Sequence, residues 1–342
     1  MDRRQFVTGS AAGLGVLAGS LGMKDARGEM AAAPRAIPAL PSEDKIGRPV
    51  RIVSIGTHGR RELEQLTGLV DQEGARGTDV IVLKETCRGY AQEPLDGPTL
   101  TAMAGLARKH STYIVCPITR ADGDLKRNSA VMLDRNGKVL AIYNKLYPVW
   151  QSECARMKIQ PGEGSVVCQT DFGRVGLSIC FDVNWVDQWE QMANRGAELV
   201  IWPSAYSAGR TLQARAINYN YYIVSCTGLP DCLVFDIDGD QLLHEENNRG
   251  DGLNISRTTL DLDRCIFHCD INEKIRPKLL AEHPDDIAVD KDWRLERWFV
   301  MKSKRAGVSA RELCRQYGME ELKAYLNRSR CEIDKCLGWE FA

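Results

Sequence analysis

Residues 173–182 read Gly-Arg-Val-Gly-Leu-Ser-Ile-Cys-Phe-Asp, an apolar stretch that ends at Cys180. Residues 175–179 predict a buried strand, and the spacing of residues 186–195 predicts a helix shortly afterwards. A cysteine at such a turn from strand to helix lies at the edge of a sheet, where it can be activated as a thiolate. Taken alone, the segment is better explained by a core cysteine, because free cysteine is among the most buried residue types.

Two other predicted strands are also followed by side chains that can act in catalysis. Residues 79–83 form an apolar strand of the kind found in parallel sheets, and Glu85 follows it. A hairpin at residues 128–143, which turns at an Asn-Gly pair, runs into Lys145. Layered α/β folds build their sites at strand ends. A solvated carboxylate and a surface lysine are nevertheless the ordinary fates of these two residue types.

The rest of the chain up to residue 261 interleaves strands with helices. Helices are predicted at residues 60–77, 99–110 and 212–219, strands at 51–55, 112–118, 199–202, 222–226 and 258–261, and a second hairpin at 232–243. This alternation predicts an α/β or α+β fold with a mixed sheet, in which 258–261 is the last strand. Beyond about residue 271 the chain is dense in charge, and helical spacing returns at 310–317 and 320–326.

The order strand–Glu85, strand–Lys145, strand–Cys180 resembles the nitrilase, or carbon–nitrogen hydrolase, superfamily. The likeness extends from about residue 51 to residue 270. Further matching segments are Gly89-Tyr90, residues 93–98 and 106–110, Asn128-Ser-Ala-Val, residues 176–182, residues 196–205 and Ala214-Arg215-Ala216. Departures from the family pattern stand at Lys84, Asn144, Tyr147 and Asn218. None of the departures removes one of the three central residues.

The resemblance implies a four-layer α-β-β-α sandwich of the nitrilase type, within the α/β (α+β) class. We divide the chain into a signal and linker at residues 1–46, a hydrolase domain at 47–272 and a mostly helical C-terminal extension at 273–342. Members of this superfamily associate through the sandwich helices and the C-terminal segment. A homodimer or larger homo-oligomer is therefore expected.

The resemblance also implies an enzyme that hydrolyses a non-peptide C–N bond in a small-molecule amide, ureido compound or nitrile. In that chemistry Cys180 attacks the carbonyl or nitrile carbon, and Glu85 transfers protons. Lys145 and the backbone N–H of Phe181 stabilise the oxyanion. Glu153 stands eight residues after Lys145, where many amidases of the family hold a second glutamate. No cofactor is implied.

Loops that follow the three strands supply candidates for substrate binding, namely Trp150, Asn184, Trp185, Tyr206 and Arg210. Packing explains the two tryptophans equally well. An aromatic side chain beside the nucleophile would favour a flat or apolar acyl group, whereas a free arginine would favour a carboxylate, as in N-carbamoyl amino acids. Two other functions stay open: an acyltransferase on the same scaffold, and a binding protein without catalytic activity.

The first 23 residues predict export. Arg3 and Arg4 precede a glycine-rich, mildly apolar stretch at residues 8–23, which resembles a twin-arginine signal. Pro34, Pro38 and Pro41 then predict a linker. We therefore expect the twin-arginine export machinery as a partner, no permanent membrane anchor, and a periplasmic or secreted location in a bacterium.

The composition excludes other classes of protein. A net charge of −1 over 342 residues argues against a nucleic-acid binder, and a 44% hydrophobic content argues against disorder. Five of the twelve cysteines lie late in the chain, at positions 265, 269, 314, 331 and 336. In an exported protein we expect disulfides there in preference to a zinc site, so no metal is predicted. We interpret the calcium-like run Asp236, Asp238 and Asp240 as a hairpin turn.

Overall fold

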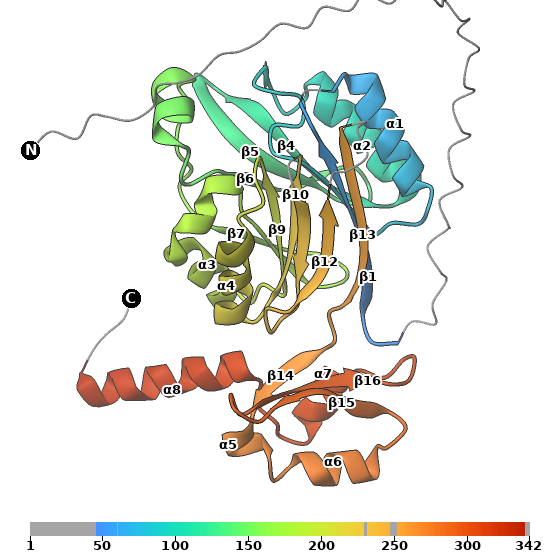
Figure 1. The fold of residues 1–342 in the computed structure, drawn as a ribbon, viewed down its shortest axis with the longest axis vertical. Helices are drawn as coiled ribbons and strands as arrows, with labels where there is room; N and C mark the ends of the chain where they lie inside the picture. Colours follow the sequence, from blue (N-terminus) through green and yellow to red (C-terminus); the bar gives the residue numbers. More distant parts are fainter. Residues whose placement is uncertain (1–45, 60, 229–230, 247–251, 339–342) are drawn as a thin grey trace, which may run out of the picture. The chain divides into compact units, whose positions relative to one another are not determined.

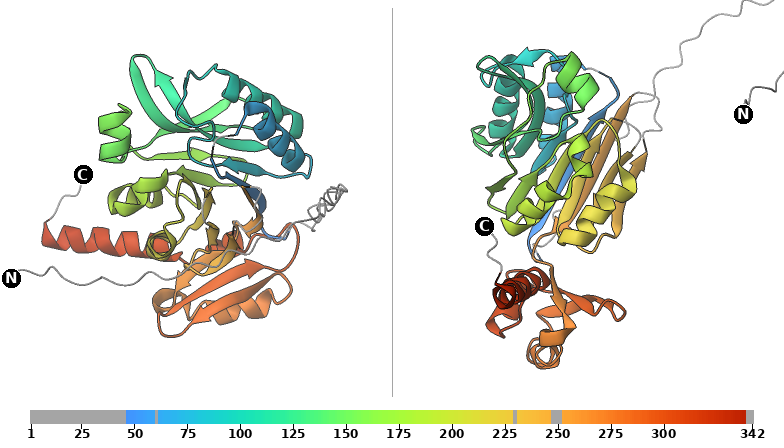
Figure 2. Two further views of the ribbon diagram at one scale, coloured as in Figure 1. Left: turned by 45° about the horizontal axis from the view of Figure 1, so that its top comes forward. Right: turned by 90° about the vertical axis from the view of Figure 1, so that its left-hand side faces the viewer.

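The protein's structure is a computed structural model that describes residues 46–59, 61–228, 231–246 and 252–338. The predicted export signal and nearly all of its linker lie outside these ranges. Figure 2 shows two sheets packed face to face, each with helices on its outer side. None of the helices in the described ranges combines the length and the apolarity that crossing a bilayer requires.

The first sheet is mixed and, within the described residues, has seven strands in the order β13-β1-β2-β4-β5-β6, with β3 beside β4. The strands are β1 (Pro49–Thr57), β2 (Val80–Leu83), β3 (Gln92–Glu93), β4 (Tyr113–Asp122), β5 (Leu125–Leu133), β6 (Val139–Asn144) and β13 (Leu253–Asp261). Strands β1, β2 and β4 run parallel, whereas β4, β5 and β6 are antiparallel. Helices α1 (Leu63–Gly74) and α2 (Pro98–His110) cover the outer face (Figure 1).

The second sheet has six strands among the described residues, in the order β12-β11-β10-β9-β8-β7. They are β7 (Val166–Gln169), β8 (Arg174–Leu177), β9 (Leu199–Ser204), β10 (Tyr222–Thr227), β11 (Asp231–Phe235) and β12 (Gln241–Glu246). Helices α3 (Val186–Asn194) and α4 (Gly209–Tyr219) cover its outer face. Two short helices flank the sandwich: a π-helix, η1 (Trp150–Arg156), and a 3₁₀-helix, η2 (Cys180–Asn184).

The layers follow from the two-residue period of a strand. In β2, Val80 and Val82 point into the core between the sheets, whereas Ile81 and Leu83 pack under α1 and α2. Strand β9 alternates in the same way between the inter-sheet core and the helices α3 and α4. Strands covered on both faces read as continuous apolar runs. The predicted four-layer sandwich is therefore confirmed.

The predicted turn between β5 and β6 is also confirmed. The Asp134 carboxylate accepts hydrogen bonds from the backbone N–H groups of Asn136 and Lys138, both at 2.8 Å. Gly137 has a φ of +72°, and a Cβ there would lie 2.3 Å from the carbonyl oxygen of Ala104. Only glycine combines this backbone conformation with such a close approach.

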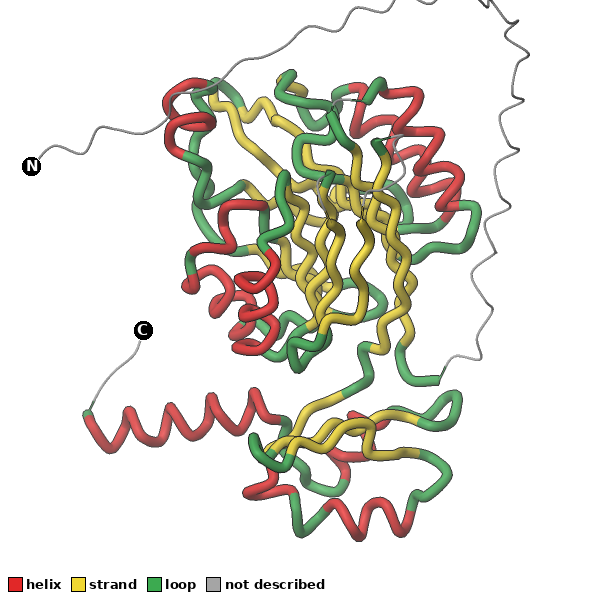
Figure 3. The backbone as a smooth tube through the Cα atoms, in the orientation of Figure 1, coloured by secondary structure: helices red, strands yellow, loops and turns green. Residues whose placement is uncertain are grey.

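Residues 265–338, which we call the C-terminal module, correct one prediction. The prediction that residues 258–261 form the last strand was wrong, because a three-stranded antiparallel sheet follows (Figure 3). It contains β14 (Cys265–His268), β15 (Ile287–Trp293) and β16 (Trp298–Ser303), and its helices are α5 (Cys269–Asn272), α6 (Arg276–Glu282), α7 (Ala310–Gln316) and α8 (Leu322–Leu337). Strand β15 is half exposed, carries Asp-Lys-Asp and shifts register after Val289, which hides its alternation. Helix α7 matches the helix predicted at 310–317, and α8 overlaps the one predicted at 320–326 but continues to Leu337.

The expected disulfides among the late cysteines are absent from the structure. All twelve cysteines lie in the described ranges, and all are free thiols. Cys265, Cys269 and Cys314 are buried in the apolar cluster of the module. Cys331 and Cys336 are exposed on α8, where a separation of five residues turns the two side chains to different sides of the helix.

Candidate active site

The three residues predicted to be catalytic, Glu85, Lys145 and Cys180, each lie just beyond the end of a strand. Glu85 lies two residues after β2, Lys145 directly after β6, and Cys180 three residues after β8. The backbone of Lys145 is fixed on both sides: its N–H donates to Asn128 at 2.8 Å, and its carbonyl accepts from Gly162 at 2.9 Å. All three central side chains are buried.

The Lys145 ammonium lies between two carboxylates. Its Nζ is 2.9 Å from Oε1 of Glu85 and 2.7 Å from Oε2 of Glu153. The side-chain amide of Asn128 donates to both carboxylates at 2.8 Å, and the backbone N–H of Val149 donates to Glu153 at 2.7 Å. Burial alone would lower the pKa of Lys145, but the charges of Glu85, Cys180 and Glu153 outweigh it and raise the pKa. Lys145 therefore stays charged at neutral pH.

Cys180 opens the 3₁₀-helix η2 with a φ of +47°, an unusual value for a residue with a side chain. The indole N–H of Trp202 holds its carbonyl at 3.0 Å. Burial raises the pKa of the Cys180 thiol to about 12, and the charge of Glu85 acts in the same direction. Lys145, the Ser204 hydroxyl and a backbone N–H oppose this rise. The resting thiol is neutral, so nucleophilic attack requires a base nearby.

Asp182 ties the strand end that carries Lys145 to the turn that carries Cys180. Its Oδ2 accepts hydrogen bonds from the hydroxyl of Tyr143 at 2.7 Å and the N–H of Ile179 at 3.0 Å. Its Oδ1 accepts from the N–H of Tyr147 at 2.8 Å. Burial raises the pKa of this carboxyl to about 6. These bonds fix the spacing between the two catalytic candidates.

Three more predicted residues lie close to Cys180. Phe181 is the second residue of η2, a position whose backbone N–H has no partner within a helix. Asn184 donates to the carbonyl of Phe181 at 2.9 Å and also hydrogen-bonds the Tyr206 side chain. Burial raises the pKa of Tyr206, and the charge of Cys180 adds to the rise. Asn184 thus connects the turn that carries Cys180 to the Tyr206 side chain.

The two predicted tryptophans line a neighbouring cavity of about 650 Å³, together with Phe181. Trp185 stacks on Tyr147 with ring centroids 4.2 Å apart, and Trp150 is 74% exposed. Other lining residues come from η1 and from the segment after Lys145. Arg210, by contrast, is exposed at the start of α4, and within the described residues no polar contact links it to the Lys145 cluster.

Two residues of the site were not predicted as functional. Asn128 bridges both carboxylates, and its Oδ1 is buried without a partner among the described atoms. Tyr90 is half exposed; burial raises its pKa, and the nearby charges of Glu85 and Glu153 add to the rise. Both residues stood in segments that carry the family resemblance, which was the available signal.

The aspartate run on the hairpin between β11 and β12 has a structural partner. Asp236, Asp238 and Asp240 surround Nζ of Lys291 at 2.9, 2.6 and 2.8 Å. A lysine from the C-terminal module thus occupies the centre of this carboxylate group, and the interpretation as a hairpin turn is confirmed. In the described part of the chain, no group of three or more His, Cys, Asp and Glu side chains is arranged to hold a metal ion.

Comparison with known proteins identifies the class. The carbon–nitrogen hydrolase family model matches residues 61–265, more than half of the chain. The chain belongs to the carbon–nitrogen hydrolase family.

Individual relatives are distant. The chain is 27% identical over 159 residues to a β-ureidopropionase of Arabidopsis thaliana, covering 42% of this chain and 39% of that protein. It is 26% identical over 131 residues to a deaminated glutathione amidase of Yersinia enterocolitica, covering 35% and 46%. The aligned part thus spans less than half the length of these two relatives.

Solved structures share the fold. Nit3 of Saccharomyces cerevisiae aligns with a TM-score of 0.55 and 19% identity, covering 68% of this chain and 95% of that one. A variant of the amidase from Nesterenkonia sp. AN1, in complex with butyramide, gives a TM-score of 0.55 and 20% identity, covering 69% and 97%.

Proposed function

We propose that the protein hydrolyses an amide or N-carbamoyl group through a thioester on Cys180, with Glu85 and Lys145 as its catalytic partners. One observation carries this proposal: a buried ammonium, held 2.9 Å from Glu85, lies beside a buried neutral thiol at the end of a strand. A purely structural ion pair has no need of a nucleophile next to it. The family of the chain supports the same reaction.

The first half of the reaction forms the thioester. Glu85 takes the proton of the Cys180 thiol while the sulfur bonds to the substrate carbon. Negative charge then develops on the substrate oxygen, where the Lys145 ammonium and the N–H of Phe181 stabilise it. Glu85 returns the proton to the leaving nitrogen, the C–N bond breaks, and ammonia or an amine departs.

The second half restores the enzyme. Glu85 accepts a proton from water as the water oxygen bonds to the thioester carbon. The tetrahedral intermediate collapses, the C–S bond breaks, and the proton passes from Glu85 to the sulfur. Glu153 acts on Lys145, because it holds the ammonium at 2.7 Å and is itself fixed by the Val149 N–H. We assign Glu153 a positioning role.

The cavity next to the nucleophile turn supports an apolar acyl group as substrate. Phe181 and Trp185 lie edge to face at 5.0 Å beside the nucleophile turn, and the cavity that they line carries one charged side chain, Lys158. Arg210, the residue that would favour a carboxylate, is turned to solvent. We therefore expect short apolar amides such as butyramide to be better substrates than ureido acids. We expect nitriles to be poorer substrates than amides.

The test is ammonia release from butyramide, N-carbamoyl-β-alanine and a matched nitrile, by wild type and by Cys180→Ala. Wild type should release ammonia, and the variant should lose at least a thousandfold in kcat/KM. A Cys331→Ala variant, which removes an exposed thiol of α8, serves as the matched control and should keep its activity. Release that survives Cys180→Ala would refute the thioester route. An added amine acceptor would reveal an acyltransferase through a new amide product, whereas a binding protein would release nothing.

We also propose export by the twin-arginine route and a homo-oligomeric state. The paired Arg3 and Arg4 before a glycine-rich apolar stretch support export. Exposed apolar side chains along α8, including Leu326, Ile333 and Leu337, support association. Replacing both arginines with lysine should retain the protein in the cytoplasm of a bacterial host. Light scattering of the purified chain should give twice its monomer mass or more.

A further inference from the structure

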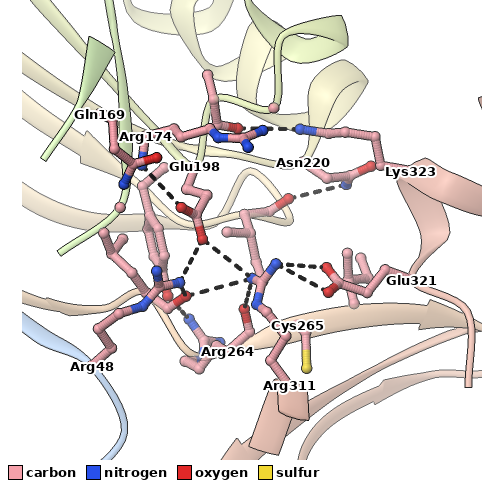
Figure 4. Close-up of a pocket in the computed structure, with 17 residues that line it drawn as sticks. Arg48, Gln169, Arg174, Glu198, Asn220, Arg264, Cys265, Arg311, Glu321 and Lys323 are labelled. Carbon is pink, nitrogen blue, oxygen red and sulfur yellow. Dashed lines mark hydrogen bonds and ion pairs between the residues drawn. The ribbon is translucent and has the colours of Figure 1, made fainter. Parts of the chain in front are cut away.

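A cavity of about 430 Å³, drawn in Figure 4, has none of the candidate active-site residues in its lining. It is lined where β8, β9 and β10 begin, and by residues from β14, α7 and α8 of the C-terminal module. Arg174 begins β8, and Cys180 lies six residues further along the chain. At roughly 3.3 Å per residue in a strand, the two positions are about 20 Å apart.

The lining carries more positive than negative charge. Arg48, Arg174, Arg264, Arg311 and Lys323 face Glu198 and Glu321. Three of the five cations have carboxylate partners: Arg48 binds Glu198 at 2.5 Å, Arg311 binds Glu321 at 2.9 Å, and Arg264 binds Asp236 and Asp290 at 2.5 and 2.7 Å. In the part of the chain that the structure describes, no salt bridge is formed by Arg174 or Lys323. Two cations are therefore in surplus.

These two cations converge on one short segment, residues 195–197. Arg174 donates to the carbonyl of Arg195 at 3.5 Å, and its guanidinium lies 2.5 Å from where a Cβ of Gly196 would be. Lys323, near the start of α8, donates to the carbonyl of Ala197 at 3.3 Å. Figure 4 shows both side chains on the same side of the cavity. Each uses only part of its donor capacity on a neutral carbonyl.

The surroundings of Lys323 show that its charge is poorly compensated. Burial lowers its pKa to about 8, although the charges of Glu321 and Glu198 oppose the shift; Arg311 adds to it. An ammonium that has lost water and faces a neighbouring guanidinium is stabilised by a bound anion. The geometry of the cavity and its surplus of positive charge thus both favour the binding of an anion.

We propose that this cavity binds a compact dianion, a phosphate or phosphate monoester, between Arg174 and Lys323. Two negative charges match the two cations in surplus, and guanidinium and ammonium groups are the donors that bind phosphate oxygens in proteins. A phosphate fills only part of 430 Å³, so the remaining space accepts a small organic group. The site is separate from catalysis and bridges the sandwich and the C-terminal module.

Calorimetric titration of the purified full chain at pH 7 tests the proposal. Inorganic phosphate and glycerol phosphate are titrated at constant ionic strength, with chloride as the balancing anion and acetate as a monoanion control. Wild type should bind at least one of the two phosphates and bind acetate at least tenfold more weakly. Tighter binding of glycerol phosphate would identify a monoester as the ligand, tighter binding of inorganic phosphate would identify free phosphate, and equal binding would show that the site recognises the phosphate group alone.

Arg174→Gln and Lys323→Met should each weaken phosphate binding at least tenfold. Lys278→Gln, which removes an exposed charge on α6 of the same module, should bind like wild type. Circular dichroism and ammonia release identify any variant that has failed to fold, and Arg174→Gln changes an exposed side chain. The proposal is overturned if wild type binds neither phosphate, or if folded Arg174→Gln and Lys323→Met both bind phosphate as tightly as wild type.

Discussion

Two lysines in this molecule are each held by several carboxylates, yet they lie in different surroundings. Lys145 is 1% exposed between Glu85 and Glu153, inside the sandwich and beside a thiol. Lys291 is 26% exposed among three aspartates of the β11–β12 hairpin, where the C-terminal module meets the sandwich. In both cases the carboxylates raise the lysine pKa against the effect of burial.

A lysine–carboxylate cluster alone therefore does not mark a catalytic site. Around Lys145 both carboxylates also accept a hydrogen bond from Asn128, and the geometry is fixed away from water. Around Lys291, Asp236 and Asp238 are also buried, but Asp240 is largely exposed and water reaches the ammonium. Depth of burial and a neighbouring nucleophile are what separate a reactive cluster from a structural one.

Replacing Lys145 with methionine should damage the protein most, and Lys291→Met is the matched change in the other cluster. Losing Lys145 leaves two carboxylates buried without a cation, which should cost about 3–5 kcal/mol of unfolding free energy. Activity should fall at least a thousandfold, because the oxyanion loses its charged donor. Lys291→Met should cost less, about 1–3 kcal/mol, because Asp236 keeps Arg264 as a cation and Asp240 reaches water, and it should keep full activity. Urea unfolding and kcat/KM provide both measurements.

The free energy of unfolding should depend on pH in opposite ways at the two clusters. Asp182 has a folded pKa raised from 3.8 to about 6, because it is buried without a cation in contact. Its stabilising contribution is therefore complete below pH 3.8 and is lost as the pH rises through 6. The loss is about 3 kcal/mol at 1.4 kcal/mol per unit. In Asp182→Asn, this fall in the free energy of unfolding between pH 4 and pH 7 should disappear.

Asp236 supplies the opposite sign as a control. Burial alone would raise its pKa, but hydrogen bonds and charges from Arg264 and Lys291 lower it below 3.8. Its contribution is present above pH 3.8 and is lost as the pH falls through the folded pKa. Asp236→Asn should therefore flatten the acid side of the stability profile. Identical profiles for the two variants would contradict the assignment of the two signs.

The sandwich could be predicted from the sequence because strands that are buried on both faces are continuously apolar. Strands such as 80–83 and 199–202 are continuously apolar, and helices α1 to α4 keep their spacing. Glu85 and Cys180 could be picked out because each follows a buried apolar strand, and Lys145 because it follows a hairpin with a clear turn signal. The bridging role of Asn128 could not, since it depends on the distance between side chains 25 and 43 positions away.

The C-terminal module was harder to predict because charge, rather than apolar periodicity, organises it. Strand β15 places Lys291 between two aspartates of its own strand, and its partner carboxylates lie more than 50 positions earlier. No local pattern reveals such a pairing. For the same reason, the convergence of Arg174 and Lys323 became visible only in three dimensions.

Asn128→Leu tests whether the amide that links the two carboxylates matters beyond filling space. The leucine keeps a similar volume but removes both 2.8 Å hydrogen bonds to Glu85 and Glu153. Because hydrogen bonds to charged groups contribute about 1.5–3 kcal/mol, kcat/KM should fall about ten- to a hundredfold. Asn128→Gln, which keeps an amide, should recover part of the loss. An unchanged kcat/KM in the leucine variant would assign Asn128 to packing alone.

The smallest expected effect comes from the aromatic residue at each cluster. Tyr90 is 52% exposed near the charges of Glu85 and Glu153, and Lys291 lies 5.3 Å from the ring centroid of Trp293. Tyr90→Leu should lower kcat/KM about three- to tenfold, because the substrate is held less firmly. The free energy of unfolding should stay within about 0.5 kcal/mol of wild type. Trp293→Leu should do the reverse, lowering stability by about 1 kcal/mol through a lost cation–π contact and leaving kcat/KM unchanged. If Tyr90→Leu altered stability and not rate, the ring would be part of the packing, and the contrast between the two lysine clusters would then depend on burial alone.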